Sequence, residues 1–278
     1  MVETGKNSRV SDIFYYMVVI VLTILFIGPI LWMIMASIKT QADAITLPPL
    51  IAFEPTLDAF RKIFQEEPFL RFLMNSTIVA LGSTIMALII SLPAAYALAR
   101  LDFRGKKELS FMILSFLMMP PIAVALPYII LMKNVHLIDT KLGLMVAHLT
   151  FNLPFAVWLL NSFIREIPVE LDEAMLVDGG TRIGVLVKII LPLSKPGIAS
   201  TAIFCIITSW NEFLFALFLA PMDAKTLPVA AVGLISFGNI FWGQIGAASV
   251  VIILPIFVFA LMVQKHLARG LTLGAVKG

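Results

Sequence analysis

The sequence contains few charged residues and a single cysteine. Of its 278 residues, 13% are charged and 60% are apolar, and the mean hydropathy is +1.00. These values exclude an ordinary soluble protein and indicate a chain that crosses a membrane several times. The lone Cys205 lies within an apolar run, which excludes a disulfide framework and a cysteine-based metal site.

Sequence motifs of known catalytic chemistry are also absent. The chain has no GxxxxGKS/T phosphate-binding loop, so it cannot bind ATP by that route, and it has no GxSxG, HExxH or CxxC motif. His148 and Asn152 stand one helical turn apart without further ligands at metal-binding spacing, which favours hydrogen bonds between helices. The net charge of +3 needs no nucleic-acid partner. We therefore expect no catalytic residue, metal or cofactor in this chain.

Six apolar stretches are long enough to cross a membrane as helices, for which about 20 residues are needed. They are residues 13–37, 72–99, 109–132, 142–164, 197–220 and 245–264. Proline interrupts most of them, which suits a cavity-lining bundle but is also common in membrane helices. The apolar piece 227–236 is about half the required length, so we expect a re-entrant or surface segment. The predicted fold is an all-α membrane protein with six transmembrane helices.

The basic residues predict the orientation of these helices. With the N-terminus inside, thirteen of the 20 Lys and Arg residues fall in inner segments and seven in outer segments. An excess of basic residues marks the cytoplasmic side, so both termini are expected in the cytoplasm of a multi-pass inner (plasma) membrane protein. On the outer side, Thr56 as an N-cap, with Leu57, Phe60 and Phe64 at helical spacing, predicts a surface helix within 56–70.

Two of the predicted transmembrane helices carry distinctive faces. Small residues recur on one face of 72–99, which predicts a seam where helices approach closely; they are Ser76, Ala80, Ser83, Ala87 and Ala94. In 197–220 a stripe contains Gly197, Thr201, Cys205, Thr208 and Glu212, with Asn211 at its edge and Trp210 beside it. Glu212 is the only acidic residue deep in any predicted span, and such residues face a bundle interior or water. Two roles stay open for Thr208, Trp210, Asn211 and Glu212: a pathway for a polar solute, or a structural hydrogen-bond network.

The segment 168–192 differs from the apolar sequence around it. Pro168 and the acidic residues after it predict a helix over 168–178. Gly179-Gly180 permits a sharp reversal, and Thr181 is the predicted N-cap of a second helix that ends near Leu191-Pro192. The first helix has two opposed apolar ridges and the second has one broad apolar face. This pattern predicts a cytoplasmic knob that docks onto another body, with its second helix against the membrane bundle.

The spacing within this segment resembles a known family motif. Glu173-Ala174-Met175, three residues, Gly179, nine residues and Ile189-Ile190-Leu191-Pro192 match the EAA-x3-G-x9-I-x-LP motif of ABC-importer permeases. Met175 is the one departure, because the motif has its second alanine there. TSWNEF at 208–213 and the tail RGLTLGAVKG at 269–278 resemble the carbohydrate-uptake branch, specifically its smaller, six-span, maltose-type permeases. The resemblance covers nearly the whole chain and implies binding-protein-dependent transport.

The resemblance implies roles for particular residues. In the family, the motif forms the coupling helix that fits into a cleft of a cytoplasmic ATPase subunit; the matching residues are Glu173, Ala174, Met175, Asp178, Gly179, Ile189, Leu191 and Pro192. The C-terminal tail would reach the ATPase pair through Gly274, Val276 and Lys277. The outer loop 221–244 would probe a solute-binding protein, or would be a plain flexible connector; its candidate residues are Gly233, Gly238, Asn239, Trp242 and Gly243.

The resemblance also implies a type I ABC-importer permease fold with three regions. Residues 1–70 would form the N-terminal tail, first transmembrane helix and extracytoplasmic segment, residues 71–264 the permease core with a cytoplasmic coupling loop at 165–196, and residues 265–278 a cytoplasmic tail. The implied partners are a second homologous permease, two ATPase subunits that hold ATP and Mg, an extracytoplasmic binding protein and membrane lipid. The expected function is ATP-driven import of a sugar, oligosaccharide or polyol-like solute, with a stand-alone ion-coupled secondary transporter as the alternative.

Overall fold

The computed structural model describes residues 7–65, 68–236 and 239–272, and the chain divides into two compact units. The first unit comprises residues 1–68 and 231–254, and the second comprises 69–230 and 255–278. The regular structure is almost all helical, because backbone in a membrane must satisfy its hydrogen bonds within its own segment. The departure from the predicted all-α fold is one pair of two-residue antiparallel strands, β1 (Ile235–Ser236) and β2 (Asn239–Ile240).

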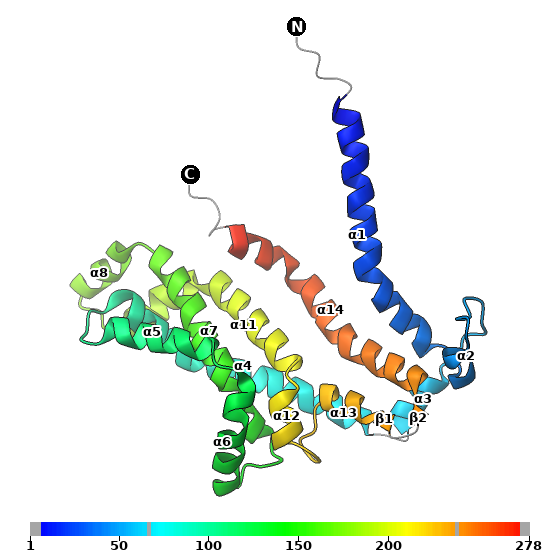
Figure 1. The fold of residues 1–278 in the computed structure, drawn as a ribbon. Helices are drawn as coiled ribbons and strands as arrows, with labels where there is room; N and C mark the ends of the chain where they lie inside the picture. Colours follow the sequence, from blue (N-terminus) through cyan, green and yellow to red (C-terminus); the bar gives the residue numbers. More distant parts are fainter. Residues whose placement is uncertain (1–6, 66–67, 237–238, 273–278) are drawn as a thin grey trace. The chain divides into compact units, whose positions relative to one another are not determined.

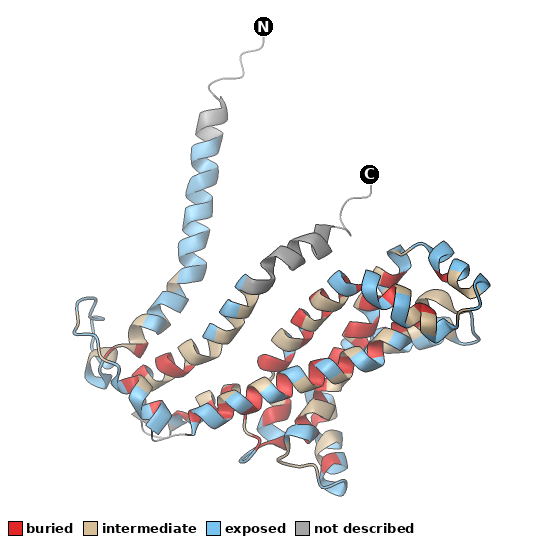
Figure 2. Ribbon diagram, turned by 180° about the vertical axis from the view of Figure 1, so that it is seen from behind, coloured by how far each residue is buried: buried red, intermediate tan, exposed pale blue. Residues whose placement is uncertain are grey.

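The first unit is built around two long helices. They are α1 (Asn7–Ser37) and the first part of α14 (Trp242–Thr272), and the short helices α2 (Gln41–Ile45) and α3 (Asp58–Gln65) follow α1. α1 is exposed along most of its length (Figure 2). An apolar helix surface of this extent needs lipid or another protein to cover it.

α1 and α14 approach each other closely at Gly246. A Cβ atom at this position would lie 2.8 Å from the Met33 carbonyl oxygen and 2.8 Å from the Ser37 nitrogen, and both are backbone atoms of α1. Only glycine therefore fits at this crossing. Gly28 of α1 provides a contrast, because a Cβ atom there would meet nothing within 4 Å.

The helix predicted within 56–70 is confirmed as α3, but its buried face is not formed by the residues whose spacing predicted it. Thr56 Oγ1 accepts a backbone N–H at the start of the helix at 3.2 Å. The buried residues are Ala59 and Ile63, whereas Leu57 and Phe64 are 67% and 46% exposed. The apolar spacing identifies the helix. Tertiary contacts within the unit determine which face is buried, and that face contains Ala59 and Ile63.

The second unit is a bundle in which α4 (Phe69–Arg100), α7 (Lys141–Glu166) and α11 (Lys195–Trp210) contact one another (Figure 1). α5 (Lys106–Leu117) contacts α7, and α6 (Pro121–Asn134) contacts α12 (Leu214–Leu219). The connection from α7 to α11 contains α8 (Val169–Val177), α9 (Arg182–Val185), the π-helix η1 (Leu186–Ile190) and α10 (Leu191–Leu193). α13 (Leu227–Gly233) follows α12 in the sequence.

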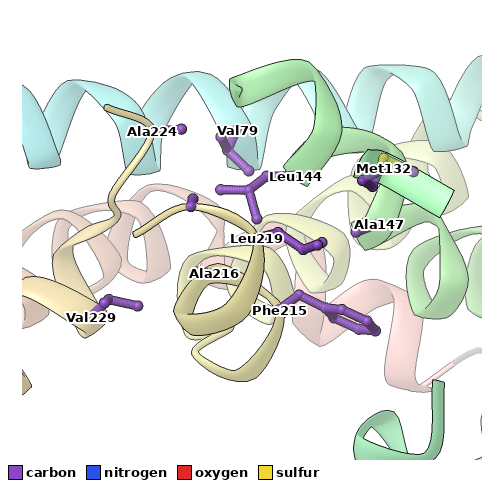
Figure 3. Close-up of a cluster of buried hydrophobic side chains, with 10 residues drawn as sticks. Val79, Met132, Leu144, Ala147, Phe215, Ala216, Leu219, Ala224 and Val229 are labelled. Carbon is purple, nitrogen blue, oxygen red and sulfur yellow. The ribbon is translucent and has the colours of Figure 1, made fainter. Parts of the chain in front are cut away.

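The predicted small-residue seam on α4 is confirmed. Ser76, Ala80, Ser83 and Ala87 are each at most 3% exposed, and only Ala94 near the end of the seam is half-buried. Small side chains let the neighbouring helices approach α4. Beside the seam lies a cluster of buried apolar side chains (Figure 3): Val79, Met132, Leu144, Ala147, Phe215, Ala216, Leu219, Ala220, Ala224 and Val229.

Among the described residues, four helices are long and apolar enough to cross a membrane, and two bent helix pairs raise the number to six if each pair is one span. The prediction of one continuous helix over 109–132 is wrong, because α5 and α6 meet at 97°. Pro120 and Pro121 lie at the bend. Both lack a backbone donor, and Pro121 occupies the first position of α6, where a proline starts a helix well.

The predicted helix over 197–220 is also interrupted. α11 ends at Trp210 and α12 begins at Leu214, so three residues between them are outside any helix. At its other end, α11 meets the helical run Arg182–Leu193 at 77°. Within 227–236, the seven-residue α13 is far too short to cross a membrane, in agreement with the sequence analysis.

We predict that Gly246→Ala destabilises the first unit. The added Cβ must push the α1 backbone away, at a cost of about 1–3 kcal/mol, which corresponds to a thermal midpoint lower by roughly 2–10 °C in detergent. The matched control is Gly28→Ala, which adds the same methyl group in open space on α1. Equal midpoints for the two variants, measured by thermal unfolding of the purified chain, would contradict the close approach.

Candidate functional site

The connection between α7 and α11 forms two helical pieces joined by a tight reversal. The predicted helix over 168–178 is confirmed as α8, and Gly179 follows it with a φ of +82°, which glycine adopts without strain. Thr181 caps the next helix as predicted, because its Oγ1 accepts the Gly184 N–H at 3.1 Å. The helical run continues through the π-turn of η1 to Leu193, so its predicted end is confirmed. Residues 168–193 are called the coupling loop below.

Met175, the departure from the family motif, packs over two glycines of this reversal. A Cβ atom at Gly180 would lie 2.8 Å from Met175 Cγ, and one at Gly184 would lie 2.9 Å from Met175 Cε. A methionine side chain is unbranched and flexible, so it fills an irregular gap well. The larger residue at this position is therefore accommodated by the smallest residues opposite it.

An apolar cluster holds the coupling loop against the bundle. Its buried members are Ala95, Tyr96, Leu160 and Ile164 from α4 and α7, and Val185 and Ile190 from the loop, with Met175 and Leu176 packed against them. Other apolar side chains of the loop are exposed: Val169, Leu171, Val177, Ile183 and Val187, with Val177 at 86%. The loop is therefore attached through one side and presents apolar surface on the other. The two sides are not the predicted ridges, because Met175 and Leu176 pack against the bundle whereas Leu171 and Val169 are exposed.

The residues matched to the ATPase-coupling motif lie mostly on the exposed side of the loop. Glu173, Ala174, Asp178, Gly179, Leu191 and Pro192 are exposed, and Met175 and Ile189 are half-buried. Glu173 is exposed, whereas its neighbour Asp172 is the buried residue of α8. Most residues of the family motif thus lie on the surface of this chain rather than in its core.

A buried ion pair links α4 to the coupling loop. Arg100 Nε donates to Asp172 Oδ2 at 2.8 Å, and the two side chains are only 8% and 6% exposed. Arg100 Nη2 also donates to the carbonyl of Ile167, just after α7, at 2.5 Å. Sequence reasoning did not pair these residues, because Arg100 served only as an orientation charge and Asp172 only as an acidic residue near a helix start. The available signal in the sequence was the position of Arg100, a basic residue at the end of a long apolar span, where it needs an acidic or carbonyl partner.

A polar network connects α4, α7 and α11 inside the bundle. Asn152 Nδ2 donates to Ser209 Oγ at 2.8 Å, and Ser209 Oγ lies 2.9 Å from Ser83 Oγ. All three side chains are buried. The predicted interhelical hydrogen bonding is confirmed for Asn152, where it replaces contacts with water that the bundle excludes. It is wrong for His148, whose ring nitrogens have no hydrogen-bond partner among the described residues.

Glu212 lies in the break between α11 and α12 and bonds to the backbone of α12. Its Oε1 accepts the Phe215 N–H at 2.8 Å and its Oε2 accepts the Ala216 N–H at 3.1 Å. His148 Nε2 of α7 lies 3.4 Å from Glu212 Oε2, although the pair does not have hydrogen-bond geometry. The carboxylate therefore has a structural role in starting α12.

Glu212 also borders a hollow that contains two other residues of the predicted stripe. This α11–α12 hollow has a volume of about 630 Å³ and is lined by Pro121, Ile122, Phe151, Ile207, Thr208, Asn211, Glu212, Phe213, Leu214 and Phe215. Thr208 and Asn211 are exposed, and among the described residues their side chains bond only to the Phe204 and Ile207 carbonyls of their own helix. Trp210 does not join them, because it is buried and lines a separate apolar pocket with Thr77 and Ala80.

On the opposite end of α4 from Arg100, polar contacts fix the connection after α12. The Asp139 carboxylate accepts the backbone N–H groups of Met222, Asp223 and Ala224 at 2.8–3.1 Å. Arg71 pairs with the Asp223 side chain at 2.7 Å. Asn75 Nδ2 donates to the carbonyls of Asp223 and Lys225, both at 2.9 Å, and Ser76 Oγ accepts the Leu227 N–H at 2.9 Å. Sequence reasoning assigned no role to Asp139 or Asn75 and counted Arg71 only as an orientation charge.

The remaining candidate residues fall in different places. Gly233 ends α13, Asn239 begins β2, and Trp242, 48% exposed, begins α14. Gly243 is buried, with the Lys39 carbonyl oxygen 3.4 Å from an added Cβ. Gly238 and the tail residues Gly274, Val276 and Lys277 lie outside the described residues. Their assignment to a binding protein or to an ATPase stays a prediction, as do the region boundaries at 70 and 264.

Comparison with known proteins identifies the class to which this bundle and loop belong. A family model described as the binding-protein-dependent transport system inner membrane component matches residues 87–273. The chain belongs to this family. It is a permease of the ABC-importer type, so the alternative of a stand-alone ion-coupled carrier is wrong.

Individual relatives agree with this assignment. The chain is 38% identical to the trehalose transport system permease protein SugB of Mycobacterium tuberculosis, over 90% of this chain and 92% of that protein. It is 35% identical to the trehalose/maltose transport system permease protein MalG of Thermococcus litoralis, over 93% and 94% of the two chains. A bacterial ABC transporter for import of the acidic polysaccharide alginate has the same fold, with a TM-score of 0.81 and 22% identity over 95% of this chain and 99% of that one.

We predict that Ser209→Ala destabilises the bundle by about 1–3 kcal/mol, because two interhelical hydrogen bonds are lost and Asn152 is left with an unpaired buried donor. The loss is measurable as a lower midpoint of unfolding by denaturing detergent. Ser162→Ala is the control, since the exposed Ser162 hydroxyl bonds only to the carbonyl of Trp158 in its own helix. A Ser209→Ala midpoint equal to that of the control would contradict a stabilising role for the network.

Proposed function

We propose that this chain is one of two homologous permease subunits of an ABC importer for a sugar, oligosaccharide or polyol-like solute. In the assembled importer it crosses the membrane six times, counting each bent helix pair as one span, and both termini lie in the cytoplasm. The excess of basic residues in the inner segments supports this orientation. Two ATPase subunits bind ATP and Mg, and an extracytoplasmic binding protein delivers the solute.

The observation that carries the proposal is the two-sided coupling loop. One side is buried against α4 and α7 through the apolar cluster and Asp172, whereas the other side exposes Glu173 and Val177. An exposed apolar side chain next to an acidic one on a firmly attached helix suits insertion into a cleft of a second protein. Closure of the ATPases on ATP would move α8, and the bundle attached to it would change from outward to inward access.

The solute class rests on the relatives and on the α11–α12 hollow. SugB and MalG are named for trehalose and for trehalose and maltose. Thr208 and Asn211 offer hydroxyl and amide groups to the hollow, and their bonds within their own helix leave hydrogen-bonding capacity for a polyhydroxylated solute. Phe151 and Phe213 in the same lining provide apolar surface for the faces of a sugar ring. Glu212 contributes mainly by holding α12 in place.

Co-purification tests the assembly. When the detergent-solubilised chain is expressed from its native gene cluster, we expect it to bring down an ATPase and a second permease. A chain that purifies without an ATPase would overturn the proposed function. Thermal-shift screening of the cognate binding protein against sugars and polyols then identifies the solute.

We predict that Glu173→Lys uncouples the importer. Charge reversal at a docking contact costs several kcal/mol, so ATP hydrolysis stimulated by the cognate, solute-loaded binding protein should fall by about tenfold or more, while the permease bundle still folds. Glu108→Lys on α5 is the matched control, because it reverses an exposed charge outside the coupling loop. Normal stimulation in the Glu173 variant would count against docking of the ATPase at α8.

We predict that Thr208→Val with Asn211→Leu raises the KM for uptake by about fivefold or more, because each lost hydrogen bond is worth about 1 kcal/mol. Within the described part of the chain neither side chain bonds to another element, so the fold should be unaffected. Uptake of the sugar identified from the binding protein provides the measurement. Ser115→Ala on α5, which also loses only a bond within its own helix, should leave the KM unchanged. An unchanged KM in the double variant would remove the hollow from the pathway.

A further inference from the structure

The attachment of the coupling loop to α4 combines two kinds of contact. The apolar cluster of Val185, Ile190, Met175 and Leu176 supplies adhesion, but apolar contact is non-directional and does not fix the position of one element along another. The Arg100–Asp172 pair is directional, because its atoms must stay at hydrogen-bond distance and angle. The ion pair is therefore the contact that sets where α8 sits relative to α4.

The environment of the pair makes it difficult to exchange for another contact. Both side chains are more than nine-tenths buried. Asp172 Oδ1 has no hydrogen-bond partner among the described residues, so within that part of the chain the carboxylate depends on Arg100 for its hydrogen bonding. Separation of the two groups would leave a charge buried without a partner, which is strongly unfavourable.

The same guanidinium also holds the end of α7. Its second donor, Nη2, bonds to the carbonyl of Ile167, which is the C-cap residue of α7 and lies two residues before α8 begins. A planar guanidinium presents its donors in a fixed geometry, so both acceptors are held in one orientation. The last turn of α4, the end of α7 and α8 thus form one rigid junction.

Helix α4 extends from this junction to two other polar contacts. Ser83, near its middle, bonds to Ser209 of α11, and Ser209 directly follows Thr208 of the α11–α12 hollow. Arg71 and Asn75, in its first turns, hold the connection after α12. α4 runs from residue 69 to residue 100 without a break, although it contains Pro93. A displacement of its Arg100 end is therefore carried to the hollow and to the far end of the bundle.

We propose that Arg100 is a positioning residue that locks the coupling helix α8 to α4, so that movement of α8 driven by the ATPase is transmitted to α4 as a rigid-body displacement. This inference rests on the proposed function, because it presupposes that α8 receives the ATPase. It adds that α4 is the helix that carries the movement onward, and that Arg100 and Asp172 connect this helix to α8.

The test uses the complete importer, purified with its ATPase and reconstituted in lipid, and the cognate binding protein purified with its endogenous solute. The measured quantity is the fold stimulation of ATP hydrolysis by that binding protein. In Asp172→Asn and Arg100→Lys we expect the stimulation to fall by about two- to thirtyfold, the range that changes along a coupling route produce. Arg100→Lys retains the charge but not the two-donor geometry, so its loss isolates the role of the guanidinium.

Two further variants separate transmission from folding. The exchange Arg100→Asp with Asp172→Arg restores an ion pair between α4 and α8, so it should recover part of the stimulation. Recovery should be incomplete, because the arginine now lies on α8 and the bond from α4 to the Ile167 carbonyl is lost. Arg165→Gln is the matched control. Among the residues that the structure describes, this exposed arginine at the end of α7 bonds only to Asn161 of its own helix, and its loss should leave the stimulation unchanged.

The outcomes distinguish this inference from the proposed function. Wild-type stimulation in both Asp172→Asn and Arg100→Lys, with uncoupling in Glu173→Lys, would overturn the role of Arg100 and leave docking at α8 standing. Wild-type stimulation in Glu173→Lys as well would overturn both. Failure of all the Arg100 and Asp172 variants to assemble, the exchange included, would overturn the inference by showing that the pair holds the fold instead of transmitting movement.

Discussion

The second unit depends on the side chains that α4 extends to its neighbours. In a bundle surrounded by lipid, apolar packing does not distinguish one helix partner from another, so specific positions come from small residues and from buried hydrogen bonds. α4 supplies both along its length: a seam of buried small residues, the Ser83–Ser209 contact in the middle, and arginines near its two ends. Each of these contacts reaches a different element of the unit, and together they fix the bundle around one helix.

The coupling loop illustrates how a segment can be anchored and available at the same time. Its inner side is stabilised by burial of Val185 and Ile190 and by Asp172, so the residues on its outer side need no contacts within this chain to stay in place. In the proposed importer, Glu173 and Val177 would therefore change partner as the ATPase opens and closes without loss of the loop's own structure. Met175, unusual for the family motif, belongs to the anchored side and fits there because Gly180 and Gly184 leave it room.

The break between α11 and α12 also combines two features, a carboxylate that caps the start of α12 and a hollow bordered by polar side chains. Ending a helix inside a membrane exposes backbone groups that lipid cannot satisfy, and such breaks occur where protein or water can. Glu212 bonds to two of these groups, while Thr208 and Asn211, on the preceding turn, border the hollow that the break creates. The acidic residue that looked most like a pathway group in the sequence is thus chiefly structural, and the neutral residues beside it face the open space.

The sequence by itself determined the class of the protein and its local elements. Apolar runs required membrane helices, Gly179 and Thr181 defined the reversal in the coupling loop, and the small residues of α4 defined a packing seam, because each of these signals acts over a few neighbouring residues. The tertiary structure decided what distant residues do together. The exposed side of α3 and the pairing of Arg100 with Asp172 depend on contacts between segments far apart in the chain. Spacing along one helix carries no information about those contacts.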